Sequence, residues 1–237
     1  MYRSICLLGL AAVAACSDSS GPDARYACIG ATLPTTAPNF INVTGQTKAG
    51  ALAPTALANV EVLASKGTDT LAIDTSSTPG FYALVIPTGG TPVNGFLKLV
   101  KSSYLTTYAY PARPLAADAV TNVLMITSTE FGLLSGAVSV TQTAGNGFVG
   151  LVVKDCNGNP LSGATVSVSP VGSSAVRYNS GSTPSSSATS TSADGVAYVF
   201  NVTAGNATVQ ASAGGHTLRA HIVNARADVI TLTEIQP

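Results

Sequence analysis

Apolar and polar residues alternate in short runs along most of the chain, and Gly, Pro and Asn separate the runs. Alternation with a period of two is typical of half-buried β-strands. In the first half the runs predict strands near residues 40–46, 59–64, 70–75, 81–86, 96–101, 106–110 and 121–127. In the second half they predict strands near residues 148–154, 164–169, 196–201, 207–212, 217–223 and 229–233. Short strands at this spacing predict an all-β protein built from sandwiches rather than βαβ units.

A helical pattern interrupts the strands between the two halves. Thr127 and Glu130 have the spacing of a capping box, and Phe131, Leu134 and Val138 then share one helical face. This pattern predicts a short helix packed between two domains.

These patterns predict three parts of the mature chain. They are a β-sandwich over residues 40–127, a linker with the short helix over 128–146, and a second β-sandwich over 147–237. Residues 170–193 are rich in Ser, Thr and Gly, a composition that predicts a long flexible loop.

The two halves resemble each other in sequence. Residues 56–62 and 159–166 each combine a turn with an alternating strand, and residues 78–84 and 193–199 each place Gly in a tight turn before a strand. Duplication of one sandwich is the economical explanation.

Three segments of the second half resemble the carboxypeptidase regulatory-like domain: residues 155–166, 192–195 and 203–205. The resemblance covers roughly residues 147–235 and is weaker over 40–127. It implies a seven-stranded, transthyretin-like (Ig-like) β-sandwich in each half, of a kind sometimes grouped with carbohydrate-binding-like folds. Domains of this family are mostly non-catalytic accessories of secreted and surface proteins, so the resemblance identifies a fold better than a function.

The N-terminus has the pattern of an export signal. One positive charge at Arg3 precedes an apolar stretch, and residues 13–16 (Val-Ala-Ala-Cys) resemble the lipobox of bacterial lipoproteins. The resemblance implies a lipoprotein signal peptide over residues 1–15, a lipidated Cys16, and a tether within 16–39. An ordinary signal peptide with an incidental Cys16 is the alternative.

Lipidation implies an attachment to the membrane through N-terminal acyl chains. Ser17, rather than Asp, follows the lipidated cysteine, and by the sorting habit of Gram-negative lipoproteins this implies the outer membrane. The expected location is therefore the cell envelope.

Two cysteines remain in the mature chain, Cys28 and Cys156. An exported protein meets an oxidising compartment, which favours a disulfide between them. Such a bond would staple the N-terminal segment to the second domain. Two free buried thiols are the alternative.

The charge of the chain excludes some partners. Charged residues make up 9% of the sequence, the formal net charge is zero, and no basic cluster is present. Nucleic acid binding lacks the positive surface that it requires. No apolar run after the signal approaches the ~20 residues of a spanning helix.

No catalytic or cofactor-binding constellation is predicted. His216 and His221 fall on one predicted strand at a separation that points them to opposite faces, and no carboxylate completes a metal site. Residues 155–159 place oxygen-bearing side chains at every second position, as a calcium loop does, but a β-turn with Asx hydrogen bonds explains the same residues. The sequence predicts no enzyme, no metal and no cofactor.

One group of aromatic residues suggests a binding site. Tyr104, Tyr108 and Tyr110 have the same parity on a predicted strand, so three phenol rings would lie in a row on one face. Sugar rings stack on such platforms. The alternative is that the tyrosines cover the core.

Together these observations predict a lipid-anchored, non-catalytic envelope protein that acts as a binding or structural module, with a glycan as the leading ligand class. The alternative is an accessory subunit that docks to a protein partner at the cell surface through an exposed sheet edge or the flexible loop.

Overall fold

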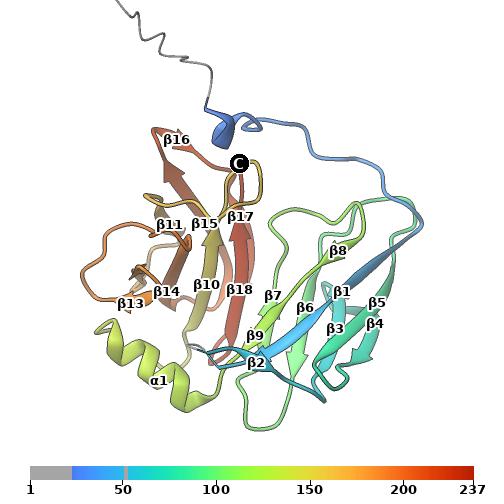
Figure 1. The fold of residues 1–237 in the computed structure, drawn as a ribbon, viewed down its shortest axis with the longest axis horizontal. Coiled ribbons are helices and arrows are strands. Elements are labelled where there is room, and N and C mark those ends of the chain that lie inside the picture. Colours follow the sequence, from blue (N-terminus) through green and yellow to red (C-terminus); the bar gives the residue numbers. More distant parts are fainter. Residues whose placement is uncertain (1–22, 51–52) are drawn as a thin grey trace, which may run out of the picture.

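A computed structural model describes residues 23–50 and 53–237, and these fold mainly into β-strands (Figure 1). The strands of the first half are β1 (Phe40–Ala49), β2 (Thr55–Ala56), β3 (Glu61–Lys66), β4 (Asp69–Thr75), β5 (Phe81–Pro87), β6 (Phe96–Val100), β7 (Thr107–Ala109), β8 (Ala119–Val120) and β9 (Val123–Met125). Those of the second half are β10 (Gly147–Val153), β11 (Thr165–Ser169), β12 (Ala175–Ser180), β13 (Thr183–Ser185), β14 (Val196–Val202), β15 (Gly205–Ala213), β16 (His216–Thr217), β17 (His221–Ala225) and β18 (Ile230–Ile235). A short 3-10 turn, η1 (Ala24–Tyr26), precedes them, and one helix, α1 (Ser128–Ala137), separates the halves. The all-β prediction is confirmed.

One sheet runs through both halves. Its nine strands follow the order β13-β12-β14-β10-β18-β7-β6-β3-β4, and the halves meet where β18 pairs in parallel with β7. At this joint the Tyr110 N–H donates to the Leu232 carbonyl at 2.8 Å, and the Ile230 N–H donates to the Thr106 carbonyl at 3.0 Å. The two halves are therefore joined by backbone hydrogen bonds and not only by the linker.

This architecture corrects the predicted pair of separate seven-stranded sandwiches. Each half has nine strands in the described chain, and the two sandwiches share a sheet. The alternation of apolar and polar side chains predicts which face of a strand is buried. The joint between the halves is instead made by backbone N–H and C=O groups, and nearly every residue has both, so no sequence pattern indicates it.

The two cores lie on opposite faces of the shared sheet. Tyr108 pairs with Thr231, which in turn pairs with Val149 of the second core. Ala109, one residue further along β7, belongs to the first core. Successive side chains point to opposite faces of a sheet. The smaller sheet β2-β1-β5, with β8 and β9 alongside β1, therefore covers one face, and the sheet of β11, β15, β16 and β17 covers the other.

Strand pairing follows the same pattern in both halves. β1 pairs with β5 in antiparallel and with β9 in parallel, and β10 pairs with β14 and β18 in the same two ways. Likewise β3 pairs with β6, and β11 with β15. This correspondence agrees with the duplication expected from the sequence, and it makes β9 the counterpart of β18.

Helix α1 has the predicted cap, but the face that Phe131 and Leu134 share is only partly buried. The Glu130 N–H donates to Thr127 Oγ1 at 3.2 Å, and the Thr127 N–H donates to Glu130 Oε2 at 2.8 Å, which completes the capping box. Phe131 packs edge-on against Phe148, with ring centroids 5.0 Å apart, and Val138 is fully buried. The helix covers one end of the second half, opposite the end where η1 lies (Figure 1).

Each predicted strand overlaps an observed one, but two predictions about the second half are wrong. Residues 170–193 contain β12 and β13 and not only loop, because β12 pairs with β14 and buried Tyr178 accepts a hydrogen bond from the Val166 N–H at 2.9 Å. The predicted strand 217–223 is two strands, so His216 and His221 lie on β16 and β17.

Candidate functional site

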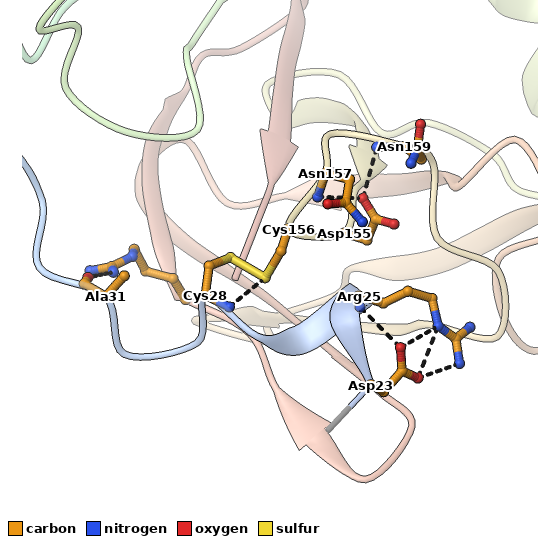
Figure 2. Close-up of a disulfide and its surroundings, with 9 residues drawn as sticks. Asp23, Arg25, Cys28, Ala31, Asp155, Cys156, Asn157 and Asn159 are labelled. Atoms are coloured by element: carbon orange, nitrogen blue, oxygen red, sulfur yellow. Dashed lines mark hydrogen bonds and ion pairs between the residues drawn. A yellow bond between two sulfur atoms is a disulfide. The ribbon is translucent and has the colours of Figure 1, made fainter. Parts of the chain in front are cut away.

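The N-terminal segment is fastened to the second half. Cys28 and Cys156 form a disulfide with their Cα atoms 5.6 Å apart, as predicted (Figure 2). The Cys156 N–H donates to the Arg25 carbonyl at 2.9 Å. Tyr26 is buried and stacks on His216 with ring centroids 4.4 Å apart. The chain is therefore held at the second half before it crosses to β1 of the first half.

The loop that carries Cys156 is an Asx turn. Asp155 Oδ1 accepts the backbone N–H groups of Asn157 and Asn159 at 2.8 and 2.9 Å (Figure 2). The Asp155 carboxylate therefore stabilises a turn, as predicted from the sequence, by accepting backbone hydrogen bonds. Within the described residues, no group of three His, Cys, Asp or Glu side chains could hold a metal ion.

Cys16 and the signal peptide lie outside the described residues. In the part of the chain that the structure does describe, no helix is both long and apolar enough to cross a membrane.

The structure does not arrange the three predicted tyrosines on one strand. Tyr104 lies in a bend before β7 and packs against the first core. The bend follows Ser103, which has a positive φ of 71° that an extended strand does not allow. The prediction of a three-ring face is therefore wrong for Tyr104.

Tyr108 and Tyr110 share a face, but that face carries a contact between the two halves. The guanidinium of Arg226, which follows β17, lies 3.8 Å from the ring centroid of Tyr108 and 4.9 Å from that of Phe96. Its Nη1 donates to the Tyr110 hydroxyl at 2.8 Å. Cation–π stacking and a charge-assisted hydrogen bond thus brace the joint between β7 and β18. We name Phe96, Tyr108, Tyr110 and Arg226 the aromatic brace.

A groove of about 930 Å³ lies between the two halves. It is an open surface site of a size that suits a ligand or an extended peptide. Its floor is the face of the shared sheet that the second half leaves uncovered, with Gly150, Val152 and Leu232. Its wall is the β8–β9 segment of the first half, residues 119–126. The groove also continues between the two sheets of the first sandwich, where Val43, Leu97, Ala109 and Val123 line it.

Three of the four charged groups that line the groove have partners within the protein, and Arg113 is the exception among the described residues. Lys154 forms an ion pair with Glu234. Asn179 Nδ2 donates to Asp194 Oδ2 at 2.6 Å, and the Tyr198 hydroxyl donates to Asn179 Oδ1 at 2.9 Å.

Burial raises the pKa of Tyr198 to about 12, so the phenol stays protonated at neutral pH. These groups form no pairing of a nucleophile with a base. The rest of the lining is mostly apolar, so the groove is built for binding by shape and apolar contact.

One indirect sign of the groove is present in the sequence. Residues 148–153 (Phe-Val-Gly-Leu-Val-Val) form a continuous apolar run, which indicates a strand covered on both faces. Half of that strand's outer face is covered by α1, and Val152 at the other half remains partly exposed in the groove. Val120 and Gly150, which the sequence separates by thirty residues, carry no local pattern that joins them.

No protein-family model matches the sequence, and no match was found among curated proteins. Among solved structures, the chain is similar to the Bacillus anthracis TIE protein at 11% identity and a TM-score of 0.26, over 82% of this chain and 33% of that one. It is similar to a Streptococcal ancillary pilin at 8% identity and a TM-score of 0.26, over 84% of this chain and 62% of that one.

A third similar structure is GBS52, the minor pilin of Streptococcus agalactiae, at 11% identity and a TM-score of 0.26, over 83% of this chain and 95% of that one. The chain thus spans about a third of the first protein's length and less than two thirds of the second's. At these TM-scores the similarity bears on neither fold nor function, and the function is argued from the chain's own surfaces.

Proposed function

We propose that this protein is a lipid-anchored, non-catalytic docking module of the cell envelope that holds a protein partner in the groove between its two halves. The observation that carries this proposal is the groove itself, which is large, mostly apolar and lined by both halves. Mostly apolar concave surfaces of this size mark interaction sites in proteins.

The attachment of the N-terminal segment supports an anchoring role. The lipobox-like residues before Cys16 and the outer-membrane sorting inferred from Ser17 belong to this proposal. The disulfide at Cys28 and the packing of Tyr26 fix the segment that follows the tether onto the second half. A load between the second half and the anchor therefore passes through the disulfide without crossing the first half.

A protein segment suits the groove better than a glycan does. Sugar sites need polar groups that are free to bond the hydroxyls. Here three of the four charged groups, Lys154, Glu234 and Asp194, are already engaged, and the remaining lining is mostly apolar apart from Arg113 and a few uncharged polar residues. The tyrosines that suggested a glycan platform are shared with Arg226 in the aromatic brace. The carboxypeptidase regulatory-like resemblance of the second half fits an accessory role of this kind.

Site-specific photocrosslinking in living cells tests the proposal. A photoreactive amino acid at Val152, on the groove floor, should give discrete protein adducts. The matched position is Ser167, exposed on β11 on the other side of the second half, which should give none. Equal adducts from both positions, or no adduct from Val152, would contradict a protein partner in the groove.

Two further measurements separate the alternatives. A glycan array on which the protein binds, with binding lost in Val152→Trp, would favour the carbohydrate alternative over the protein partner. Replacement of Cys16 by Ala should release the protein from membranes, as judged by fractionation. Mass spectrometry of the mature N-terminus should find an acylated Cys16, and an unmodified residue would end the lipoprotein part of the proposal.

A further inference from the structure

The wall of the groove is an edge of a sheet. In the described chain β8 and β9 each pair with β1 on one side and have no strand on the other. The Thr121 N–H donates to the Thr44 carbonyl of β1 at 2.8 Å. Backbone groups alternate in direction along a strand. The N–H and C=O of Val120 therefore face away from β1, toward the groove.

The same argument applies to Leu124. On the side away from β1, the Ile126 carbonyl accepts the Leu105 N–H at 2.9 Å. Leu124 lies two residues before Ile126, and backbone groups two residues apart on a strand point the same way. The N–H and C=O of Leu124 therefore also face the groove. The outward backbone groups of Val120 and Leu124 therefore lie open beside an apolar floor, one on each side of residues 121–122, where the strand is interrupted and the Thr121 carbonyl accepts the Tyr82 hydroxyl.

Two other sheet edges are guarded by side chains. At β5, the carboxylate of Asp74 accepts the Ala83 N–H at 2.7 Å. At β17, Arg226 Nη1 donates to the Asn224 carbonyl at 3.0 Å. Proteins block their edges in such ways to prevent unwanted strand pairing. Among the described residues no side chain bonds the outward backbone groups of Val120 or Leu124, so this edge is open to a further strand.

The repeat shows which kind of strand fits this edge. β9 is the counterpart of β18, because each pairs in parallel with the first strand of its half. β18 receives β7 on its free side, also in parallel. β7 is a short uncharged strand, Thr107-Tyr108-Ala109, whose small residues Thr107 and Ala109 are buried.

The first sandwich also has space for such a strand. In the second half β17 lies against β18 and closes the side of the sandwich. In the first half β7 pairs with β6 as β17 pairs with β15, so β7 and β9 are the counterparts of β17 and β18. These two strands pack less closely, and the groove enters between the sheets at Leu97, Ala109 and Val123. Inward side chains of an added strand would fill this space.

We propose that the β8–β9 edge binds an extended segment of a partner protein, which adds in parallel to β9 as β7 adds to β18. The segment is uncharged and carries small or β-branched residues at alternate positions. Its backbone bonds Val120 and Leu124, and its inward side chains enter the first sandwich. The inference rests on the proposed docking function and specifies how the partner binds in that groove.

A peptide copied from the chain itself serves as the probe. A fluorescein-labelled peptide with the sequence of residues 105–111 (Leu-Thr-Thr-Tyr-Ala-Tyr-Pro) is titrated with the full chain purified in detergent, and anisotropy reports binding. Saturable binding is expected. The peptide with Pro in place of its first Tyr should bind about tenfold more weakly, because Pro removes a ladder donor.

Two matched variants of the protein locate the site. Val120→Pro removes an outward N–H on the groove edge, where the side chain is 76% exposed. Val85→Pro makes the same change on β5, on the other side of β1, where the side chain is 59% exposed and the N–H also faces away from β1. Val120→Pro should weaken peptide binding about tenfold, and Val85→Pro should leave it unchanged. Unchanged melting temperatures in both variants confirm that each folds.

Three results would overturn the inference: no saturable binding, equal binding to Val120→Pro and the wild type, or equal loss in both variants. Sedimentation velocity addresses a second copy as the occupant. Dimers of the free chain that disappear in Val120→Pro would show self-association and overturn the partner assignment. If peptide binding fails while Val152 still gives protein adducts in cells, the docking function stands and only the strand mode is wrong.

Discussion

The two halves repeat one pattern of strand pairing but differ in what covers their margins. In the second half α1 packs on Phe148 and Phe200, the N-terminal segment is stapled at Cys156, and β17 lies against β18. In the first half the side of the sandwich between β7 and β9 opens into the groove. The edge that is filled in one repeat is free in the other. The pairing of β7 with β18 is therefore the model for the strand that we propose to bind at the β8–β9 edge.

The largest expected effect concerns the staple of the second half. Loss of a disulfide that spans 128 residues should lower the free energy of unfolding by about 5 kcal/mol in the chain-entropy model. Denaturant unfolding of the wild type with and without reductant measures this loss. The double variant Cys28→Ser/Cys156→Ser is the control and should not respond to reductant. If the free energy of unfolding of the wild type did not change with reductant, the disulfide would not stabilise the protein.

The aromatic cluster under α1 in the second half can be compared with an exposed aromatic residue of the first half. Phe200 is fully buried and packs against Phe148 at 4.9 Å between ring centroids. Phe200→Ala should lower the free energy of unfolding by about 3–5 kcal/mol. Phe81, on the outer face of β5, is 57% exposed, and Phe81→Ala should change stability by less than about 0.5 kcal/mol. Similar losses in both variants would mean that the aromatic cluster under α1 is not a core.

The aromatic brace should contribute less than the core does. Arg226→Ala removes the stacking on Tyr108 and the hydrogen bond to Tyr110, and we expect a loss of about 1–2 kcal/mol. Arg219→Ala, which removes one exposed hydrogen bond to the Ala31 carbonyl, should cost less than about 0.5 kcal/mol. Thermal unfolding of both variants compares them. Equal effects would show that Arg226 does not brace the joint.

The smallest expected effect is a dependence on pH. His221 is half-buried, its Nε2 has no hydrogen-bond partner, and burial lowers its pKa below the usual 6.5. The unfolded chain then binds more protons than the folded one as the pH falls below about 6.5, so this residue makes stability decline with acidification. Melting temperatures between neutral and acidic pH should fall less steeply for His221→Leu. His216→Gln is the control, and a slope unchanged in His221→Leu would contradict the prediction.

Local rules account for what the sequence predicted correctly. Alternation placed the strands, and the spacing of Thr127 and Glu130 placed the cap of α1, because both depend on residues close in sequence. The disulfide followed from the compartment and from the count of remaining cysteines.

The errors arose where distant segments decide the structure. The backbone groups of Tyr108 pair with β18, and Arg226 covers its ring, yet neither partner lies near it in sequence. Tyr178 makes a strand of a segment whose Ser-rich composition favours a loop, because its hydroxyl and ring are bound in the second core. The groove depends on how both halves meet, and no local pattern at Val120 reports it.

The central claim is that the open edge of the first half is occupied in the cell. Amide hydrogen exchange tests it most directly when isolated cell envelopes are compared with the purified protein. The account predicts slower exchange in envelopes for peptides that cover residues 119–126, and no change for β17, whose edge Arg226 guards. Equal exchange of residues 119–126 in the two preparations would contradict it.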